Sequence, residues 1–175
     1  MRILGIDPAL RTTGYGVIDA SATRRPQLVE AGVVAPHNGA SLERRLRELY
    51  DGIAEVIEQT KPERVVIEAL YTSYRNPKTA LLMAHARGVL CLAAARAGVA
   101  VEALDHARVK RALVGSGAAR KGQINAMVTH LLGLRQAPKP DDVSDALALA
   151  LAFANIANHP VIPSGAPKAR SRRAR

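Results

Sequence analysis

Apolar positions along the chain recur with two different periods, and together these predict an α/β protein. Short runs with no polar interruption, such as the cores of 2–6 and 64–67, are typical of strands buried on both faces. Longer stretches with apolar residues three or four positions apart, such as 42–57, are typical of helices. We expect strands at 2–6, 13–18, 27–35, 64–67 and 99–104, and helices at 41–60, 78–97, 106–113, 121–132 and 141–158.

The order of these elements predicts the topology of the sheet. The first three strands follow one another through short turns, which indicates an antiparallel meander. The helix at 41–60 then leads to a new strand at 64–67, and such a crossover favours a strand parallel to the first. The expected fold class is therefore α/β, with a mixed five-stranded sheet flanked by helices.

Acidic residues stand at three notable places. Asp7 and Glu68 each end a strand predicted to be buried, and parallel neighbours would bring them to the same edge of the sheet. Asp142 and Asp145 are three positions apart and so share a helix face. Simpler explanations exist, because Asp7 could cap the following turn, and acids in a first helical turn suit the macrodipole. Asp145 lies a full turn into the helix, so the second explanation accounts for it less well.

Taken together, these acids predict a metal site made of Asp7, Glu68, Asp142 and Asp145. Four carboxylates in one place repel one another unless they are protonated or bind cations. Oxygen ligands without Cys or His suit Mg²⁺ or Mn²⁺. Two such ions ~4 Å apart would activate a water and stabilise a leaving 3′ oxygen, which is the chemistry of phosphodiester hydrolysis.

The charge of the chain points to a polyanionic partner. The net charge is +10, and the stretch from Pro160 holds five basic residues and no acid, so the remainder still carries +5. Nucleic acid is the simplest partner for such a protein. The composition predicts one folded domain at 1–158 and a disordered basic tail at 159–175.

Other compositional features favour a cytoplasmic location. Cys91 is the single cysteine, which gives no disulfide framework and no argument for secretion. Asp7 interrupts the early apolar run that a signal peptide would need. The longest uninterrupted apolar run, 146–154, is shorter than the ~18 residues of a membrane span.

Four stretches of the chain form a set of motifs in a fixed order. They are GIDP and TGYGVI near the N-terminus, VVIE at 65–68, KGQINAMVTHLLG at 121–133, and DDVSDALALA at 141–150. This combination resembles the RuvC family of Holliday-junction resolvases. The similarity runs from about Ile3 to Ala157. The resemblance implies a ribonuclease-H-like fold and a homodimeric, Mg²⁺-dependent endonuclease. Such an enzyme nicks two opposed strands of a four-way junction symmetrically and leaves 5′-phosphate and 3′-hydroxyl ends.

The family's four acids fall on Asp7, Glu68, Asp142 and Asp145, each proposed as both catalytic and metal-binding, with two Mg²⁺ per subunit and Mn²⁺ as a substitute. Asp141 leaves the third assignment ambiguous, and we choose Asp142 because the family places its acids three apart before Ala-Leu. Two departures stand out. Ala9 replaces a common Gly, which matters if the turn needs a positive φ. Tyr71 stands where a Phe is familiar.

The resemblance also implies residues that bind DNA. Tyr71 matches an aromatic that wedges into junction bases, and stacking on one base contributes ~1–3 kcal/mol. Lys110 and Lys121 match lysines that bind backbone phosphates, and Lys121 also opens a helix. Arg75 and Lys78 flank the aromatic loop and are further candidates. The alternatives are that Tyr71 packs on the sheet edge and that the lysines are solvated.

The helix at 78–97 is apolar on most of its circumference, which predicts burial on more than one side. A symmetric junction is cut symmetrically by two sites on a C₂ dimer, so we expect this helix to form a homodimer contact. The alternative is that short helices of the same chain cover it. The resemblance further implies the RuvA–RuvB branch-migration complex as a partner.

Other functions remain open at this level. A junction-binding protein without catalysis, or a ribonuclease H acting on RNA–DNA hybrids, would share much of the pattern. The opening motif is also similar to the phosphate loop of sugar-kinase and actin-like ATPases, although those need two such domains and a longer chain.

Overall fold

The computed structural model describes residues 1–70 and 77–158. Within them, every predicted strand and helix is present, with ends within one residue of the expected ones. The strands are β1 (Arg2–Asp7), β2 (Thr13–Asp19), β3 (Gln27–Val34), β4 (Arg64–Glu68) and β5 (Ala100–Leu104). The helices are α1 (Leu42–Thr60), α2 (Pro77–Arg96), α3 (His106–Val114), α4 (Lys121–Leu132) and α5 (Asp141–Asn158).

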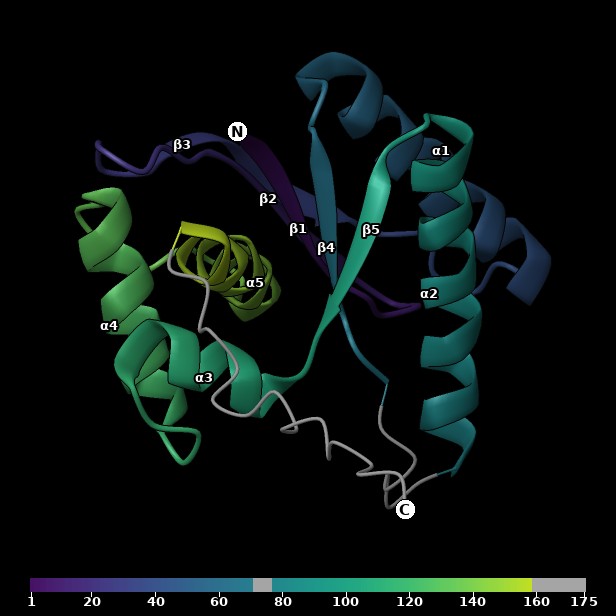
Figure 1. Cartoon of the computed structure of the whole chain (residues 1–175). Helices are drawn as coiled ribbons and strands as arrows, with labels where there is room; N and C mark the ends of the chain where they lie inside the picture. Colours follow the sequence, from purple (N-terminus) through teal and green to yellow (C-terminus); the bar gives the residue numbers. More distant parts are fainter. Residues whose placement is uncertain (71–76, 159–175) are drawn as a thin grey trace, which may run out of the picture.

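The five strands form one sheet in the order β3-β2-β1-β4-β5 (Figure 1). β1, β2 and β3 pair antiparallel, whereas β4 runs parallel to β1 and β5 runs parallel to β4. This arrangement confirms the predicted meander followed by parallel strands. It also places the carboxyl ends of β1, β4 and β5 at the same edge of the sheet.

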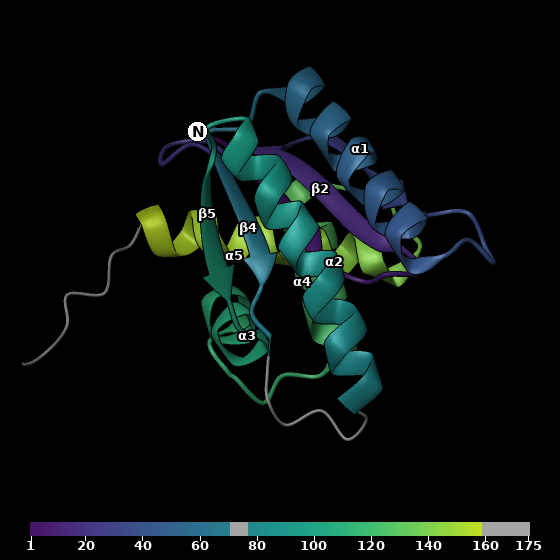
Figure 2. The same cartoon turned by 90° about the vertical axis from the view of Figure 1, so that its right-hand side faces the viewer.

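Helices cover both faces of the sheet. α1 and α2 pack together on one face, and α5 crosses the other face against β1 and β2, with α3 and α4 outside it (Figures 1 and 2). One apolar cluster fills the space between the sheet and α5, and a second lies under α1 and α2. The sheet is therefore the middle layer of three.

Alternation along the central strands sorts their residues between these two clusters. Ile3 of β1 and Val66 of β4 face α5, and Leu4 and Ile6 face α1 and α2. Successive side chains point to opposite faces. Asp7, four positions after Ile3, therefore continues the row that faces α5.

Backbone geometry refines two expectations about turns. Ala9 has no positive φ, so the turn after β1 does not require the glycine that is common in the family. Ser41 occupies the N-cap of α1, but its hydroxyl donates to the Glu43 carboxylate and accepts no hydrogen bond from a backbone N–H of the helix. At the other end of α1, Lys61 adopts the left-handed conformation with φ 48°.

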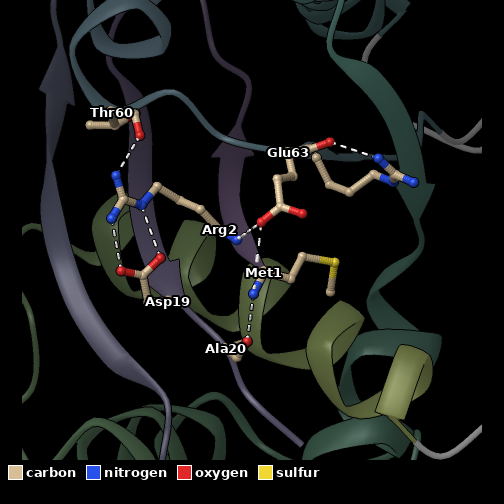
Figure 3. Close-up of polar contacts among 7 residues, drawn as sticks. Met1, Arg2, Asp19, Ala20, Thr60 and Glu63 are labelled. Atoms are coloured by element: carbon tan, nitrogen blue, oxygen red, sulfur yellow. Dashed lines mark hydrogen bonds and ion pairs between the residues drawn. The ribbon is translucent and has the colours of Figure 1, made fainter.

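A cluster of polar contacts holds the edge of the sheet opposite the acids (Figure 3). The Arg2 guanidinium donates two bonds to the Asp19 carboxylate, at 2.9 and 2.8 Å, and a third to the Thr60 carbonyl at 2.8 Å. Glu63 accepts from the Arg2 backbone N–H at 2.9 Å. Bidentate Arg–carboxylate pairs are specific in geometry. This one joins the start of β1 to the ends of β2 and α1.

α2 is less buried than its composition predicted. It packs against α1 and β5, while α3 and α4 pack on the opposite face of the sheet. Leu81 and Leu92 of α2 remain 63% and 51% exposed. The alternative that short helices of the same chain cover α2 is therefore wrong, and a contact with a second subunit stays a prediction. By contrast, α5 has buried residues all around its circumference.

Candidate active site

Asp7 and Glu68 lie next to each other at the carboxyl edge of the sheet. Ile6 and Ile67 are partners in the parallel β1–β4 ladder, so the acids that follow them are neighbours. Glu68 is 6% exposed. Burial, and then the negative charge of Glu68, raise the pKa of Asp7 to about 8. A carboxyl group in this position resists ionisation unless a positive charge is close.

The N-terminal part of α5 brings further acids to the same edge, because glycines let the helix lie directly on the strands. A Cβ at Gly5 would collide with the backbone of Ala146 and come within 3.0 Å of the Ala150 nitrogen. A Cβ at Gly14 would collide with the Asp142 backbone and lie 2.8 Å from its Cβ. The first turns of α5 are thus fixed over β1 and β2, near Asp7.

A cavity of about 280 Å³ opens at this edge. Three of the four predicted acids contribute to its wall. Its lining residues are Asp7, Glu68, His106, Val109, Lys110, Lys121, Ile124, Asp145, Ala148 and Leu149. Acids come from β1, β4 and α5, and basic side chains come from α3 and α4. The cavity therefore combines carboxylate oxygens with cations and an apolar floor.

Asp142 is close to the cavity without lining it. The charges of Asp145 and Asp142 both raise the pKa of Asp7, after the larger effects of burial and of Glu68. Asp141, which is more exposed, is absent from the groups that act on Asp7. Its carboxylate instead lies 3.1 Å from the Lys121 ammonium. These relationships support Asp142 over Asp141 as the third acid.

Lys121 bridges two acids of α5. Its ammonium lies 3.0 Å from the Asp145 carboxylate as well as 3.1 Å from that of Asp141. Burial lowers the pKa of Lys121, but hydrogen bonds to Asp145 and Asp141 outweigh this and raise it. The lysine is thus charged and held at the wall of the cavity.

His106 is a site residue that the sequence pattern did not single out. Its Nε2 lies 2.6 Å from Oε1 of Glu68. The hydrogen bond to Glu68 raises the pKa of His106, against the lowering effect of its partial burial. One signal could have found it. β5 runs parallel to β4 and ends at Leu104, so the first residue of the next helix reaches the edge at which Glu68 stands.

A second residue outside the predicted set holds Glu68 through its backbone. The Arg87 side chain, in the middle of α2, donates from Nε to the Glu68 carbonyl at 3.1 Å. α2 and the catalytic edge of β4 are therefore directly joined. No motif marked this arginine, since the contact depends on how α2 lies across the sheet.

The predicted DNA-binding residues have different outcomes. Lys110 and Lys121 line the cavity. Lys78 lies in the first turn of α2 and is exposed. Tyr71 and Arg75 lie outside the described residues, and their proposed roles stay predictions.

The donor set fits a hard divalent cation. Asp7, Glu68 and Asp145 offer carboxylate oxygens, which Mg²⁺ and Mn²⁺ accept. The raised pKa of Asp7 indicates that these acids need a nearby positive charge to ionise together. Across 1–70 and 77–158, no three His, Cys, Asp or Glu side chains are arranged closely enough to hold an ion as they stand. Lys121 and His106 lie against the carboxylates instead.

The fold and this edge together define a class of protein. A mixed sheet in this strand order, with carboxylates at the ends of two neighbouring parallel strands and helices on both faces, has the layout of the ribonuclease-H-like class of folds. A family model for "Crossover junction endodeoxyribonuclease RuvC" matches residues 3–153. The chain belongs to the RuvC family, so it is an endonuclease of crossover junctions and depends on a divalent metal ion.

Curated relatives are similar along most of their length. The RuvC of Rhodopirellula baltica is 46% identical over 159 residues, which cover 91% of this chain and 89% of that protein. The RuvC of Moorella thermoacetica is 45% identical over 157 residues, with 90% and 93% covered. In both comparisons the similarity therefore spans most of each chain.

Solved structures give the same result for the fold. Thermus thermophilus RuvC has a TM-score of 0.84 at 34% identity, with 90% of this chain and 95% of that chain covered. The same protein in complex with a Holliday junction substrate has a TM-score of 0.82 at 32% identity and the same coverage. The yeast mitochondrial Holliday junction resolvase shares the fold at a TM-score of 0.59 and 14% identity, with 87% and 78% covered. The ribonuclease-H-like fold expected from the motifs is confirmed.

Proposed function

We propose that the chain resolves four-way DNA junctions in recombination and repair with two Mg²⁺ ions per subunit, held by Asp7, Glu68, Asp142 and Asp145. The observation that carries this proposal is that the half-buried Asp7 and the buried Glu68 line one cavity with Asp145, and that lysines also contribute to its wall. The acids need cations, and a basic rim attracts phosphates. Mn²⁺, which accepts the same ligands, would substitute.

In this mechanism the chain's residues have separate tasks. The four acids hold the ions, which when bound lower the pKa of an attacking water and stabilise the leaving 3′ oxygen. Lys110 and Lys121 bind the phosphates that flank the scissile bond. The apolar floor of Val109, Ile124 and Leu149 limits bulk water beneath the site. Hydrolysis leaves a 5′-phosphate and a 3′-hydroxyl, which are ligatable.

Four-way junction DNA is the proposed substrate. The related Thermus thermophilus protein was solved with a Holliday junction, and the net charge of +10 suits a branched polyanion. In this scheme Tyr71 stacks on unpaired bases at the junction centre, while Arg75 and Lys78 contact the backbone near it. The role of Tyr71 rests on the motif match, and the roles of Arg75 and Lys78 rest on their positions beside it in the sequence.

A homodimer through α2 would supply two sites for the two opposed strands. The first turns of α2 extend past the carboxyl end of β4 (Figure 2), and Leu81 and Leu92 are 63% and 51% exposed. Exposed apolar side chains on a helix favour a protein contact. We expect Leu81→Glu to give a monomer in sedimentation that binds junctions more weakly and loses paired nicking. A dimer with unchanged cleavage would exclude this face.

Two further assignments belong to the same proposal. RuvA–RuvB is the expected branch-migration partner, on the resemblance alone. A cytoplasmic location is proposed because the family acts on DNA. α2 has the length and a mean hydropathy of 1.2 that a membrane span would need, with 22% of that window buried. One such helix is weak evidence for a membrane, and an α2 dimer contact accounts for its composition.

The test uses a mobile four-way junction, a linear duplex and an RNA–DNA hybrid of the same sequence, each with Mg²⁺ or EDTA. Paired nicks at symmetric positions on the junction, with Mg²⁺ only, are expected. Tight junction binding without nicks in Mg²⁺ or Mn²⁺ would make this a binding protein, and cleavage of the hybrid would favour a ribonuclease H. Asp7→Asn should keep junction binding and lose cleavage.

A further inference from the structure

Glu68 is approached by one side chain that neither the motifs nor the proposed metal ligands include. The imidazole Nε2 of His106 lies 2.6 Å from Glu68 Oε1. The Glu68 side chain is 7% exposed, whereas that of His106 is 67% exposed. The imidazole therefore contacts a buried carboxylate from the solvent side of the cavity, where both residues line the wall.

The backbone that carries His106 is firmly placed relative to Glu68. Leu104 is the partner of Glu68 in the parallel β4–β5 ladder, and the Ala69 N–H donates to the Leu104 carbonyl at 2.9 Å. His106 follows two residues later and opens α3. Asp105 caps this helix by accepting from the Arg108 N–H at 2.7 Å. The backbone of His106 is therefore fixed by the capped start of α3 and by the β4–β5 ladder that also contains Glu68.

We propose that His106 is a positioning residue that fixes the carboxylate of Glu68 for metal binding. This inference rests on the proposed function. A Glu side chain has several rotatable bonds, and the Glu68 carboxylate also hydrogen-bonds with the neighbouring Asp7. An N–H donor on one oxygen selects one orientation of the carboxylate and leaves the other oxygen for the ion. Partners of this kind orient ligating groups in metal sites.

The position of His106 distinguishes it from Lys121, whose ammonium also contacts acids at the cavity. Lys121 divides its contacts between two acids of α5, at 3.0 and 3.1 Å, and holds neither alone. His106 has one acidic contact within the described residues, and that contact is Glu68. A planar ring with two side-chain torsions also loses less freedom on ordering than a lysine.

The experiment measures Mn²⁺ binding to the DNA-free protein by the EPR signal of the free ion. His106→Ala should weaken Mn²⁺ binding by roughly 10-fold or more, as loss of such partners does in other metal sites. His106→Gln, which keeps an N–H donor, should restore part of the affinity. His130→Ala, an exposed histidine on α4 outside the cavity, is the matched control and should bind like the wild type.

Cleavage supplies a second measurement. In EDTA, the junction affinity of His106→Ala should stay within about twofold of the wild-type affinity. Its single-turnover cleavage rate should fall at low Mn²⁺ and recover as Mn²⁺ saturates, because the affected step is ion binding. A rate that stays low at saturating Mn²⁺ would instead place His106 in a later step and overturn the positioning role.

Unchanged Mn²⁺ binding by His106→Ala would also overturn the positioning role of His106. Tighter binding would overturn it as well, because it would mean that the imidazole obstructs the ion. If His106→Ala does not fold, as judged by circular dichroism, His106→Leu replaces it as the variant without a donor.

Asp7→Asn is measured in parallel, as the test of the metal site itself. If Asp7→Asn binds Mn²⁺ like the wild type, the proposed metal site fails. If only Asp7→Asn loses binding, the site stands and His106 has no positioning role.

Discussion

Gly14 of β2 and Asp142 of α5 are in backbone contact, with no room for a side chain between them. A Cβ at Gly14 would collide with the carbonyl group of Asp142 and lie 2.8 Å from its Cβ. Gly14 is also the ladder partner of Asp7. The glycine therefore sets the distance between the strand that carries one acid and the helix that carries two others.

Gly14→Ala should both destabilise the protein and impair cleavage. The added methyl group has to push α5 off the sheet, and overpacking of this kind costs about 1–3 kcal/mol. Urea unfolding measures the stability, and single-turnover junction cleavage measures the site. Gly122→Ala on α4 is the control, because nothing lies within 4 Å of its added Cβ. Equal stability of the two variants would contradict the close approach.

Replacing Arg87 should slow cleavage, because its side chain supports the backbone that carries Glu68. Arg87→Ala removes the 3.1 Å bond to the Glu68 carbonyl, and a bond of this type contributes about 1–2 kcal/mol. We expect slower cleavage with the oligomeric state unchanged in sedimentation. Arg87→Lys should recover little, because an ammonium lacks the planar geometry of the guanidinium. Full activity of Arg87→Ala would mean that the end of β4 needs no support from α2.

Substitutions of Asp142 and of Asp141, two neighbouring acids of α5, should have clearly different effects on the rate of junction cleavage. Asp142→Asn should reduce cleavage more than about 100-fold if Asp142 is a metal ligand. Asp141→Asn removes an exposed contact with Lys121, a type of ion pair that contributes at most about 1 kcal/mol, so the loss should stay below about fivefold. The reverse order of effects would transfer the third assignment to Asp141.

Divalent metal should stabilise the wild type and not the Asp7→Asn variant. A ligand at 100 times its dissociation constant adds about 2.7 kcal/mol to the free energy of unfolding. In EDTA, Asp7→Asn should be at least as stable as the wild type, because it removes a carboxyl group whose pKa is raised to about 8 by burial and by Glu68. Thermal unfolding with Mg²⁺ and with EDTA measures both effects. Equal stabilisation by Mg²⁺ would place the ion elsewhere.

The fold was predictable from the sequence because strong patterns coincide with strong physical constraints. β1 and β4 are uninterrupted apolar runs, and both are central strands whose residues Ile3 and Val66 are fully buried. The predicted parallel crossover from the first strand to the fourth was enough to place Asp7 beside Glu68, as the structure shows. Element order was thus sufficient to bring two of the four acids together.

The parts that were not predicted depend on packing between distant segments. His106 reaches Glu68 through the pairing of β5 with β4; the predicted strand end at 104 pointed to that edge of the sheet, but nothing in the spacing singled out this side chain. Arg87 reaches Glu68 through the placement of α2. The partner of the exposed face of α2 could not be fixed from the sequence, because an apolar helix looks the same whether its partner is in the same chain or in another.

Acidic pH should weaken the Arg2–Asp19 pair at the opposite edge of the sheet. The hydrogen bond that Asp19 accepts from Arg2 lowers the pKa of Asp19 below its ordinary value. The pair therefore stabilises the fold above the pKa of Asp19 in the unfolded chain, and this contribution is lost as pH falls through the folded value. The difference in stability between wild type and Asp19→Asn should shrink from pH 7 to pH 3. A constant difference would show that the charge of Asp19 is irrelevant.

The burial of α5 on all sides has a consequence for the motions of the protein. This helix carries acids at its first turns and fills the core with the rest of its length, including Leu147 and Leu151, which are fully buried. A segment enclosed in this way opens only when the whole domain opens. We therefore expect Asp142 and Asp145 to keep their places over the sheet, because the rest of their helix moves only when the core opens, whereas Leu81 and Leu92 of α2 face solvent.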